Sequence, residues 1–397
     1  MRILVASALL AFSSLPMMTF VHADNCFALS GTNKSDISAN DKPTTLKIRI
    51  ADCAEGAILE VKGRYELFDP ISHLILDSGF FGKRAAIIAD GSGICWGDRL
   101  PSIHQIRIVP VNNETTTLVN GIEYRGCLDV YNLNGQIAII NEIDIESYLK
   151  STLSSQVPLQ SEERLLEAIA VIARTNAYYL AQRNPQAHWH VTAEEAKYFG
   201  HGMALQNIAI DRAIENTRHI VMTYRSHPFA STWTEDSAGR TANYSHIFRK
   251  QVLTPSGVSA PLAARERPKH TWTTSIAGNE LAKAFGFNKL TAIHPYLDQE
   301  SEKVYAVQLT DGIISKNVDF FALQQFLGAE KLRSNDFAVS IKDDKVIFKG
   351  WGKGHGVGLC LYSAHIMAEK GTSVGKILSH FYPQVEMKKI RSLSQNE

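Results

Sequence analysis

The hydrophobic pattern of the sequence changes once, near Asn141, and this change limits the folds that the chain can adopt. From Thr44 to Ile140 the apolar residues fall in short, often alternating runs, most of them bounded by Gly, Asn, Asp or Pro. This pattern is typical of strands joined by tight turns. The runs are TLKIRI, AILEVKG, RYELF, HLILD, AAIIAD, HQIRIVPV, TTTLV, YRGCLDVY and QIAII. We therefore predict a β-rich domain over residues 44–140.

Helical patterns begin after Asn141. Asp144 is placed to cap a short helix, IESYLKSTL, and Ser161 to cap a longer one whose body is RLLEAIAVIARTNAYYLAQR. The longer helix is apolar nearly all round, which predicts that it is buried. Arg174 lies inside it, and a buried guanidinium needs a carboxylate or a ligand. Strands return later, with helices predicted near 280–284 and 320–327, so the fold class is α+β with a mixed C-terminal half.

The N-terminal residues, MRILVASALLAFSSLPMMTFVHA, have the form of a secretory signal. Arg2 precedes a short apolar run, and small residues near Ala23 suit a signal peptidase. The run is shorter than the ~20 apolar residues of a spanning helix, although an uncleaved anchor is the alternative. We expect a signal over 1–23, a polar linker over 24–43 and a tail over 391–397. The protein would be secreted across the inner membrane, to the periplasm or the cell wall.

The net charge limits the classes of partner that we expect, and the cysteines bear on disulfides and zinc sites. The formal net charge is +1 and no basic run stands out, so we expect no nucleic-acid partner. A nearly neutral polymer suits such a surface better. The five cysteines are Cys26, Cys53, Cys95, Cys127 and Cys360, and an oxidising compartment would permit one or two disulfides. Buried free thiols are the equal alternative, and the spacing matches no structural zinc site.

A glycine-dense segment, GWGKGHGVG, begins at Gly350 and leads directly into a predicted helix. Its spacing fits neither a P-loop nor a dinucleotide fingerprint. Glycines at this density let the backbone approach a ligand closely, and a tight structural turn is the second interpretation. His355, at its centre, is either a site residue or a packed histidine.

This segment and three upstream segments resemble the SpoIID/LytB family. GWGKGHGVGLCLYSAHIMAEKGTSVGKILSHFYP keeps the family's Gly-His-Gly-Val-Gly core, with Tyr362 and Ala364 matching and Leu361 and Ser363 differing. YRGCLDVY with INEIDIESYLK, and EAIAVIARTNAYYL with Arg174, match further family motifs in order. PFASTWTEDSAGRT is a weaker match that lacks the zinc-binding His and Cys of some members. The resemblance covers roughly residues 44–390.

The resemblance implies a lytic transglycosylase that acts on peptidoglycan glycan strands already stripped of peptides, during wall remodelling or septation. That chemistry needs one carboxylic acid to protonate the glycosidic oxygen. The family's acid position is occupied here by Gln156, with Pro158 fixing the register. An amide can bond a sugar hydroxyl, but it has no proton to give. The first hypothesis is therefore a transglycosylase with a displaced acid, and the second is a glycan-binding protein or amidase enhancer.

The candidate residues follow from the same comparison. The displaced acid would be one of Glu146, Glu162, Glu163 and Glu235. The predicted catalytic positions are Gln156, Arg174, His355 and Tyr362, and the predicted substrate-binding residues are Glu146, Tyr148, Gly354, Gly356, Gly358 and Trp351. We expect a groove where the helix that holds Arg174 meets the glycine turn. The implied partners are glycan strands and a cell-wall amidase, with no cofactor or metal.

Three alternatives stay open at this point. Arg174 shares a helix face with Glu167, so a structural ion pair would also explain it. His188, His190 and His201 could bind zinc, although solvated loop histidines are the simpler interpretation. The rings of Trp189, Tyr198 and Trp351 could stack on sugars or belong to the core.

Overall fold

The structure is a computed structural model that describes residues 45–112, 114–157, 161–201 and 207–390. The predicted signal, linker and tail lie outside these residues. The described chain is an α+β protein, as predicted, with strands first and helices and further sheets after them. None of its described helices is long and apolar enough to span a bilayer.

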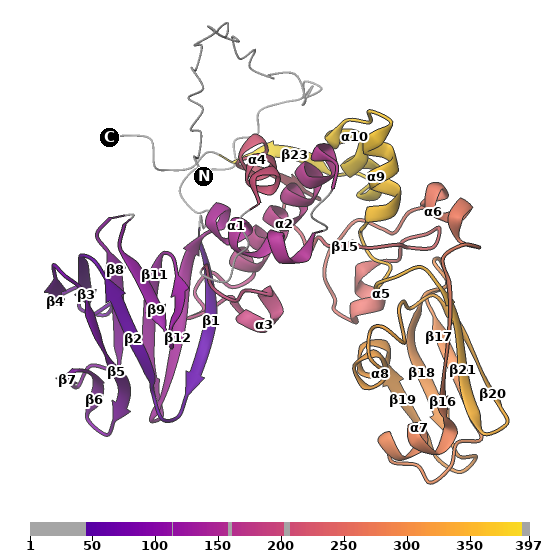
Figure 1. Cartoon of the computed structure of the whole chain (residues 1–397), viewed down its shortest axis with the longest axis horizontal. Coiled ribbons are helices and arrows are strands. Elements are labelled where there is room, and N and C mark those ends of the chain that lie inside the picture. Colours follow the sequence, from indigo (N-terminus) through magenta and orange to yellow (C-terminus); the bar gives the residue numbers. More distant parts are fainter. Residues whose placement is uncertain (1–44, 113, 158–160, 202–206, 391–397) are drawn as a thin grey trace, which may run out of the picture.

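Two sheets form the N-terminal part of the molecule and share one apolar core (Figure 1). Their strands alternate as the sequence predicts: Leu59 and Val61 point into the core, whereas Ile58 and Lys62 are exposed. In order, the seven-stranded sheet contains β13 (Val191–Thr192), β1 (Thr45–Cys53), β12 (Gln136–Asp144), β11 (Cys127–Leu133), β8 (Gln105–Pro110), β3 (Tyr65–Phe68) and β4 (Ile75–Gly79). The six-stranded sheet contains β10 (Ile122–Tyr124), β9 (Thr116–Val119), β2 (Ala57–Lys62), β5 (Lys83–Asp90), β6 (Gly93–Trp96) and β7 (Asp98–Pro101).

The first helix, α1 (Ile145–Gln156), starts where β12 ends, at the border of the sandwich that these two sheets form. The Asp144 side chain accepts a hydrogen bond from the Ser147 backbone N–H at 3.1 Å, so the predicted cap is confirmed. The long helix α2 (Glu163–Arg183) is capped by Glu162, whose side chain accepts from the Arg164 N–H at 2.7 Å. The prediction of Ser161 as the cap was wrong, because the longer Glu162 side chain reaches the free N–H groups.

Helix α2 is buried, as its apolar pattern predicts. Its neighbours share the core of the sandwich, so the β-rich part and the helices pack as one body. The helices that contact α2 are α1, α4 (Ile208–Asn216), α9 (Leu361–Glu369) and α10 (Val374–Phe381). The short helix α3 (Ala193–Ala196) packs on β1.

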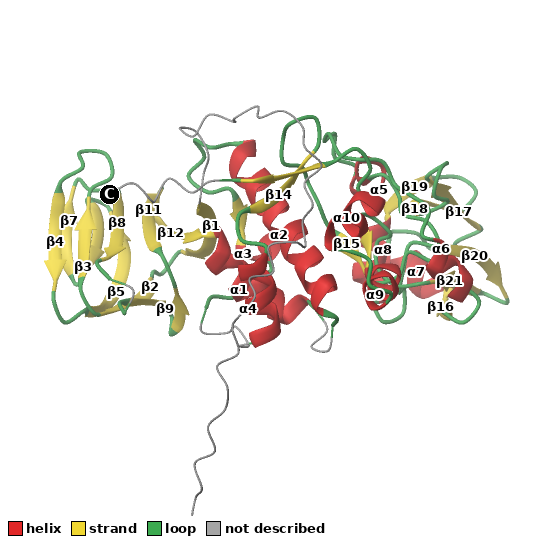
Figure 2. Cartoon of the chain, turned by 90° about the horizontal axis from the view of Figure 1, so that it is seen from above, coloured by secondary structure: helices red, strands yellow, loops and turns green. Residues whose placement is uncertain are grey.

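A second apolar core lies within the mixed C-terminal half, at the end of the molecule opposite the sandwich (Figure 2). Two three-stranded sheets enclose it: β16 (Thr271–Ala277), β21 (Lys345–Trp351) and β20 (Phe337–Lys342), and β17 (Ala292–Leu297), β18 (Val304–Thr310) and β19 (Ser315–Asp319). The helices α7 (Gly278–Ala284) and α8 (Phe320–Leu327) contain both predicted helical segments.

Two small sheets connect distant parts of the chain. Strand β14 (Ile220–Thr223) pairs antiparallel with β23 (Glu386–Lys389). Strand β15 (Trp233–Thr234) pairs in parallel with β22 (Leu359–Cys360), directly after the glycine turn. The second pairing brings the segment around 230–242 against the segment 350–362. The short helices α5 (Tyr244–Phe248) and α6 (Pro261–Glu266) follow the first of these segments.

Candidate functional site

The glycine turn is a close-packed contact between two segments that resemble the family. Gly354, Gly356 and Gly358 all have positive φ, which glycine adopts without strain. A Cβ atom on Gly358 would overlap the Thr232 carbonyl oxygen, and one on Gly354 would overlap the Thr234 hydroxyl. The glycines are therefore required by packing inside the protein, and the structural interpretation explains them without a ligand.

His355 is half-buried at the centre of this turn. Its Nδ1 accepts a hydrogen bond from the Val357 N–H at 3.1 Å, which leaves the ring proton of the neutral form on Nε2. The ring meets the edge of Phe248, with 5.1 Å between centroids. Burial, with a smaller effect from the positive charge of Lys197, lowers the pKa of His355 to about 4. His355 is thus neutral at pH 7 and is poorly suited to donate a proton.

An aspartate, a histidine and a tyrosine meet beside the turn. Asp236 is 8 % exposed, and one carboxylate oxygen accepts from the Ala238 N–H at 2.8 Å. The other carboxylate oxygen lies 2.6 Å from Nδ1 of His270. The imidazole of His270 lies perpendicular to the ring of Tyr362, with 4.9 Å between centroids. Tyr362, a predicted site residue, is half-buried in the first turn of α9.

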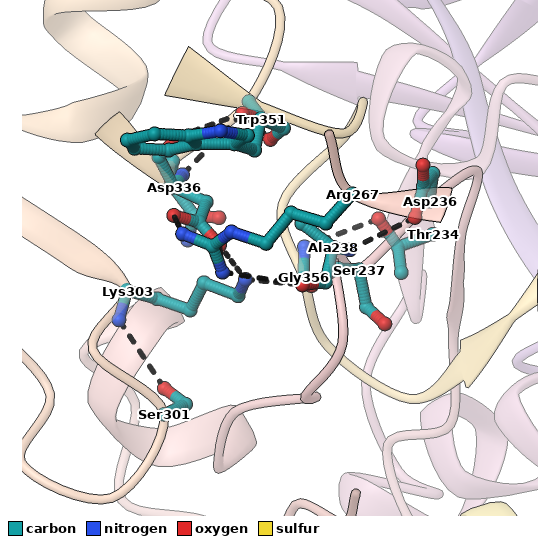
Figure 3. Close-up of polar contacts among 12 residues, drawn as sticks. Thr234, Asp236, Ser237, Ala238, Arg267, Ser301, Lys303, Asp336, Trp351 and Gly356 are labelled. Atoms are coloured by element: carbon teal, nitrogen blue, oxygen red, sulfur yellow. Dashed lines mark hydrogen bonds and ion pairs between the residues drawn. The ribbon is translucent and has the colours of Figure 1, made fainter. Parts of the chain in front are cut away.

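Trp351, predicted to bind substrate, is held by a group of charged residues (Figure 3). The Arg267 guanidinium covers the Trp351 ring at 4.5 Å and donates two hydrogen bonds to Asp336, at 3.1 and 3.0 Å. Lys303 is 1 % exposed and donates to Asp336 at 2.6 Å and to the Ser237 carbonyl at 2.7 Å. Burial lowers the pKa of Lys303, and Asp336 opposes that change. This network fixes the half-buried indole of Trp351 in place.

A polar hollow of about 300 Å³ lies beside this network. Arg267 and Lys303 form part of its wall, so the hollow adjoins the group that holds Trp351. Charged side chains of both signs surround it, and its other lining residues include Arg240, Glu300 and Glu302. Such a hollow suits an uncharged, hydroxyl-rich ligand that both donates and accepts hydrogen bonds.

Arg174 is completely buried, and each of its five N–H groups is occupied. It donates to both oxygens of Glu146, from Nε at 2.8 Å and from Nη2 at 2.7 Å. The other three bonds go to the Thr217 hydroxyl and to the carbonyls of Ile214 and Ile220. No donor is left for a sugar. We therefore remove Arg174 from the candidate site and assign it a structural role.

The structural partner of Arg174 is Glu146, and Glu167 instead accepts from the Asn216 amide at 2.9 Å. Glu146 is 7 % exposed and fully engaged, so it too leaves the predicted substrate site. Tyr148 is buried and donates to the Ala196 carbonyl at 3.1 Å, which gives it a packing role.

The predicted groove is wrong in one respect, because the Arg174 side chain does not face the glycine turn. Strand β22 and helix α9, which follow the glycine turn, do pack in the same core as α2. The Ser231 hydroxyl in the facing segment donates to the Ile172 carbonyl of α2 at 2.8 Å. Arg174 points instead toward α1, α4 and β14, away from this side. The candidate site therefore lies at the turn and does not include the Arg174 side chain.

Gln156 is the last residue of α1 and is half-buried. Its side-chain amide donates to the Thr152 carbonyl of the same helix at 3.3 Å. The proposed replacement acids have other contacts: Glu162 caps α2, and Glu235 pairs with Lys353 at 2.9 Å. Glu163 is exposed in the first turn of α2.

The remaining candidates separate in space. His188 contacts the Tyr131 ring, the Nδ1 atom of His190 accepts from the Lys47 N–H, and His201 approaches the Ser151 hydroxyl. His190 is buried, contrary to the expectation of a solvated loop residue. Across the described ranges, no three His, Cys, Asp or Glu side chains converge as a metal site would require.

The cysteines and the other aromatic candidates are also placed. Cys53, Cys95, Cys127 and Cys360 are free thiols, and Cys26 lies outside the described residues. The buried hydroxyl of Tyr198 bonds Asn141 at 2.7 Å, so this ring belongs to the core. Trp189 lies under the Arg49 guanidinium at 4.4 Å, on the sandwich.

Sequence reasoning missed Asp236, His270 and Arg267. Asp236 lies inside the weakest of the matched segments, so its position in TEDSAGRT was the one available signal. His270 and Arg267 belong to a loop, RPKH, whose residues show no motif. Only the fold brings that loop onto the glycine turn, where the His270 carbonyl accepts from the Gly352 N–H at 2.9 Å.

Comparison with known proteins finds a family match in the helical centre of the chain. A family model described as "Stage II sporulation protein" (SpoIID) matches residues 133–224, which contain α1, α2 and β14. An uncharacterized protein of Chlamydia pneumoniae is 34% identical over 206 residues, covering 49% of this chain and 75% of the relative. An uncharacterized protein of Brachyspira hyodysenteriae is 24% identical over 349 residues, covering 86% of this chain and 92% of the relative.

Stage II sporulation protein D of Bacillus subtilis is 23% identical over 260 residues, covering 61% of this chain and 74% of that protein. The helical centre of the chain, which contains the matched residues 133–224, is of the SpoIID type. The chain belongs to the SpoIID family. Membership in this family supports a cell-wall-related role.

Proposed function

We propose that this protein binds peptide-stripped glycan strands of peptidoglycan, outside the inner membrane, as a wall protein of the SpoIID family. The observation that supports it most strongly is the meeting of segments 230–242 and 350–362, both of which resemble the family, at one half-exposed surface. That surface presents the rings of Trp351 and Tyr362, and the polar hollow adjoins Trp351 through Arg267. Aromatic faces and mixed hydrogen-bonding groups are what a neutral sugar chain requires.

Gln156 supports binding in preference to cleavage by the family's route. General acid catalysis typically contributes about 10²–10⁴ in rate, and an amide at this position cannot supply it. A cell-wall amidase that removes the peptides would act before this protein, and the protein would recognise the product. Lytic transglycosylase activity is the second candidate, and the pair Asp236–His270 is the observation that favours it.

Co-sedimentation with insoluble peptidoglycan tests the proposal. The purified protein is mixed with amidase-treated peptidoglycan and with the same material before treatment. We expect the bound fraction to be larger on the treated strands, because peptides no longer shield the sugars. Equal binding to both, or binding to neither, would contradict the proposal.

A substitution at the site provides the second arm. Tyr362→Ala removes a half-buried ring on the site surface and should weaken strand binding several-fold. Tyr296→Ala is the matched control, because Tyr296 is a half-buried tyrosine on β17, in the sheet of β17, β18 and β19. If Tyr362→Ala binds strands as well as the unchanged protein does, this surface is not part of the site.

A further inference from the structure

The pair Asp236–His270 has the geometry of a proton-transfer device. The Asp236 side chain is 9 % exposed and that of His270 is 34 % exposed, so a buried carboxylate holds a ring that reaches solvent. With Nδ1 of His270 bonded to the carboxylate at 2.6 Å, the ring orientation is fixed. No group in the described part of the chain bonds Nε2 of His270. An imidazole held in this way is the arrangement that general acid–base catalysis uses.

The place of the pair is as informative as its geometry. The His270 ring lies perpendicular to the ring of Tyr362, and the His270 carbonyl accepts a hydrogen bond from the Gly352 N–H of the glycine turn. Arg267, three residues before His270, covers Trp351 and lines the polar hollow. A sugar chain that contacts Trp351 and Tyr362 would therefore pass close to Nε2.

The carboxylates nearby are less suited to give a proton. Glu235 is paired with Lys353 at 2.9 Å, and Glu266 is paired with Lys269 at 2.5 Å. The hydrogen bond from Lys269 lowers the pKa of Glu266, which keeps that carboxyl ionised. Asp236 is committed to His270 and to the Ala238 N–H. Among the described groups at this surface, His270 is the one that combines exposure with an open nitrogen.

We propose that His270 is the general acid for cleavage of the glycan strand, with Asp236 as its positioning residue, in place of the carboxyl that Gln156 lacks. This inference rests on the proposed function, because it requires the strand to bind at the turn. It moves the chemistry from the end of α1 to the surface formed by α6, α9 and the glycine turn.

The reaction balances without water or a cofactor. Protonated His270 gives its Nε2 proton to the glycosidic oxygen as the bond between that oxygen and the anomeric carbon breaks. The C6 hydroxyl of the same sugar attacks the anomeric carbon, and a new carbon–oxygen bond closes the anhydro ring. The hydroxyl proton passes to Nε2, which restores the imidazolium. The net result is an intramolecular transfer that leaves one anhydro end and one free hydroxyl end.

The test is release of anhydro-sugar ends from peptide-free strands by the purified full chain, followed by mass spectrometry, with co-sedimentation run in parallel. We expect release by the unchanged protein and a loss of about 10²-fold or more in His270→Gln, because glutamine is a polar side chain of similar size that cannot act as the acid. His246→Gln is the matched control. His246 faces buried Asp298 at 2.5 Å but contacts neither Tyr362 nor Trp351 in the described structure.

A second variant separates chemistry from folding. In His270→Gly, added imidazole should restore release, because a free imidazole can occupy the vacated space and donate a proton. If imidazole restores the release rate of His270→Gly without changing its thermal unfolding, the role of His270 is chemical. A purely structural histidine would not give this combination of results. Asp236→Asn should lower release by about tenfold or more and leave strand binding unchanged.

The outcomes are distinguishable from those of the proposed function. Strand binding with no anhydro ends from the unchanged protein would overturn the role of His270 and leave the binding proposal standing. Full release by His270→Gln, or an equal loss in His246→Gln, would also overturn it. Absence of binding to stripped strands would remove both proposals together.

Discussion

The Arg174–Glu146 pair allows a quantitative test of the division between structure and function in this chain. Arg174→Met keeps an unbranched apolar side chain but removes five hydrogen bonds from a fully buried site. The change leaves Glu146 as a buried carboxylate, 7 % exposed, without its cation. Breaking a buried pair by removing one partner typically destabilises by about 3–5 kcal/mol. We expect a loss in that range, against a total of about 5–15 kcal/mol.

Urea unfolding followed by circular dichroism measures this loss. Arg212→Met, at an exposed position on α4, is the control and should change stability by less than about 0.5 kcal/mol. The double variant Arg174→Met with Glu146→Met removes the stranded charge and should recover part of the loss.

Strand binding decides the role of Arg174 independently of stability. Arg174→Lys keeps a positive charge but loses the five fixed donors. We expect this variant to be less stable than the unchanged protein, with part of it still folded. We expect normal strand binding per folded molecule. A destabilisation below about 1 kcal/mol in Arg174→Met, or a folded Arg174→Lys that no longer binds strands, would refute the structural assignment.

Three further predictions follow from other contacts. Burial raises the pKa of Glu167, so the contribution of this side chain to stability is favourable below its ordinary pKa of 4.5 and is lost as the pH rises through the folded-state pKa. Glu167→Gln should therefore be more stable than the unchanged protein at pH 7. Urea unfolding at pH 4 should show a smaller difference in stability. Gly358→Ala should destabilise the protein by about 1–3 kcal/mol, because φ is +78° and the new Cβ would overlap the Thr232 carbonyl, whereas Gly135→Ala, at positive φ with open space, should lose less in the same assay. Because the proposed acid is His270 at the glycine turn, Gln156→Glu, at the end of α1, should leave anhydro-sugar release and strand binding unchanged; a rise in release of about 10²-fold would show instead that the strand reaches the end of α1 and is cleaved there.

Local rules predicted the elements well, because their causes lie within a few residues of chain. The alternating runs became strands, the Asp144 cap was correct, and the all-round apolar pattern identified a buried α2. The Ser161 cap failed because the neighbouring Glu162 could reach the same N–H groups. The choice between two plausible caps depends on side-chain reach, which the spacing alone does not show.

Contacts between distant segments were much less predictable. Helical spacing placed Glu167 on the same face as Arg174, yet α1 brought Glu146 there instead, with the geometry to accept two hydrogen bonds. The glycine density indicated a close approach of backbone, and the fold supplied a protein segment as the partner of that backbone. Asp236 and His270 come from different loops with no shared pattern, so only the packing of α6 against α9 brings them together.

The residues on the two sides of α2 have different roles. On one side, Arg174 and Glu146 connect α1, α4 and β14, and their donors and acceptors are occupied. On the other, β22 and α9 continue from the glycine turn, where Tyr362 and His270 remain half-exposed. A substitution on the first side should act through stability, and one on the second through strand handling. Gln156, which stands at the family's acid position, lies on α1 and is not part of the surface at the turn. The missing acid therefore leaves that surface intact. Strand binding can persist whether or not His270 restores cleavage.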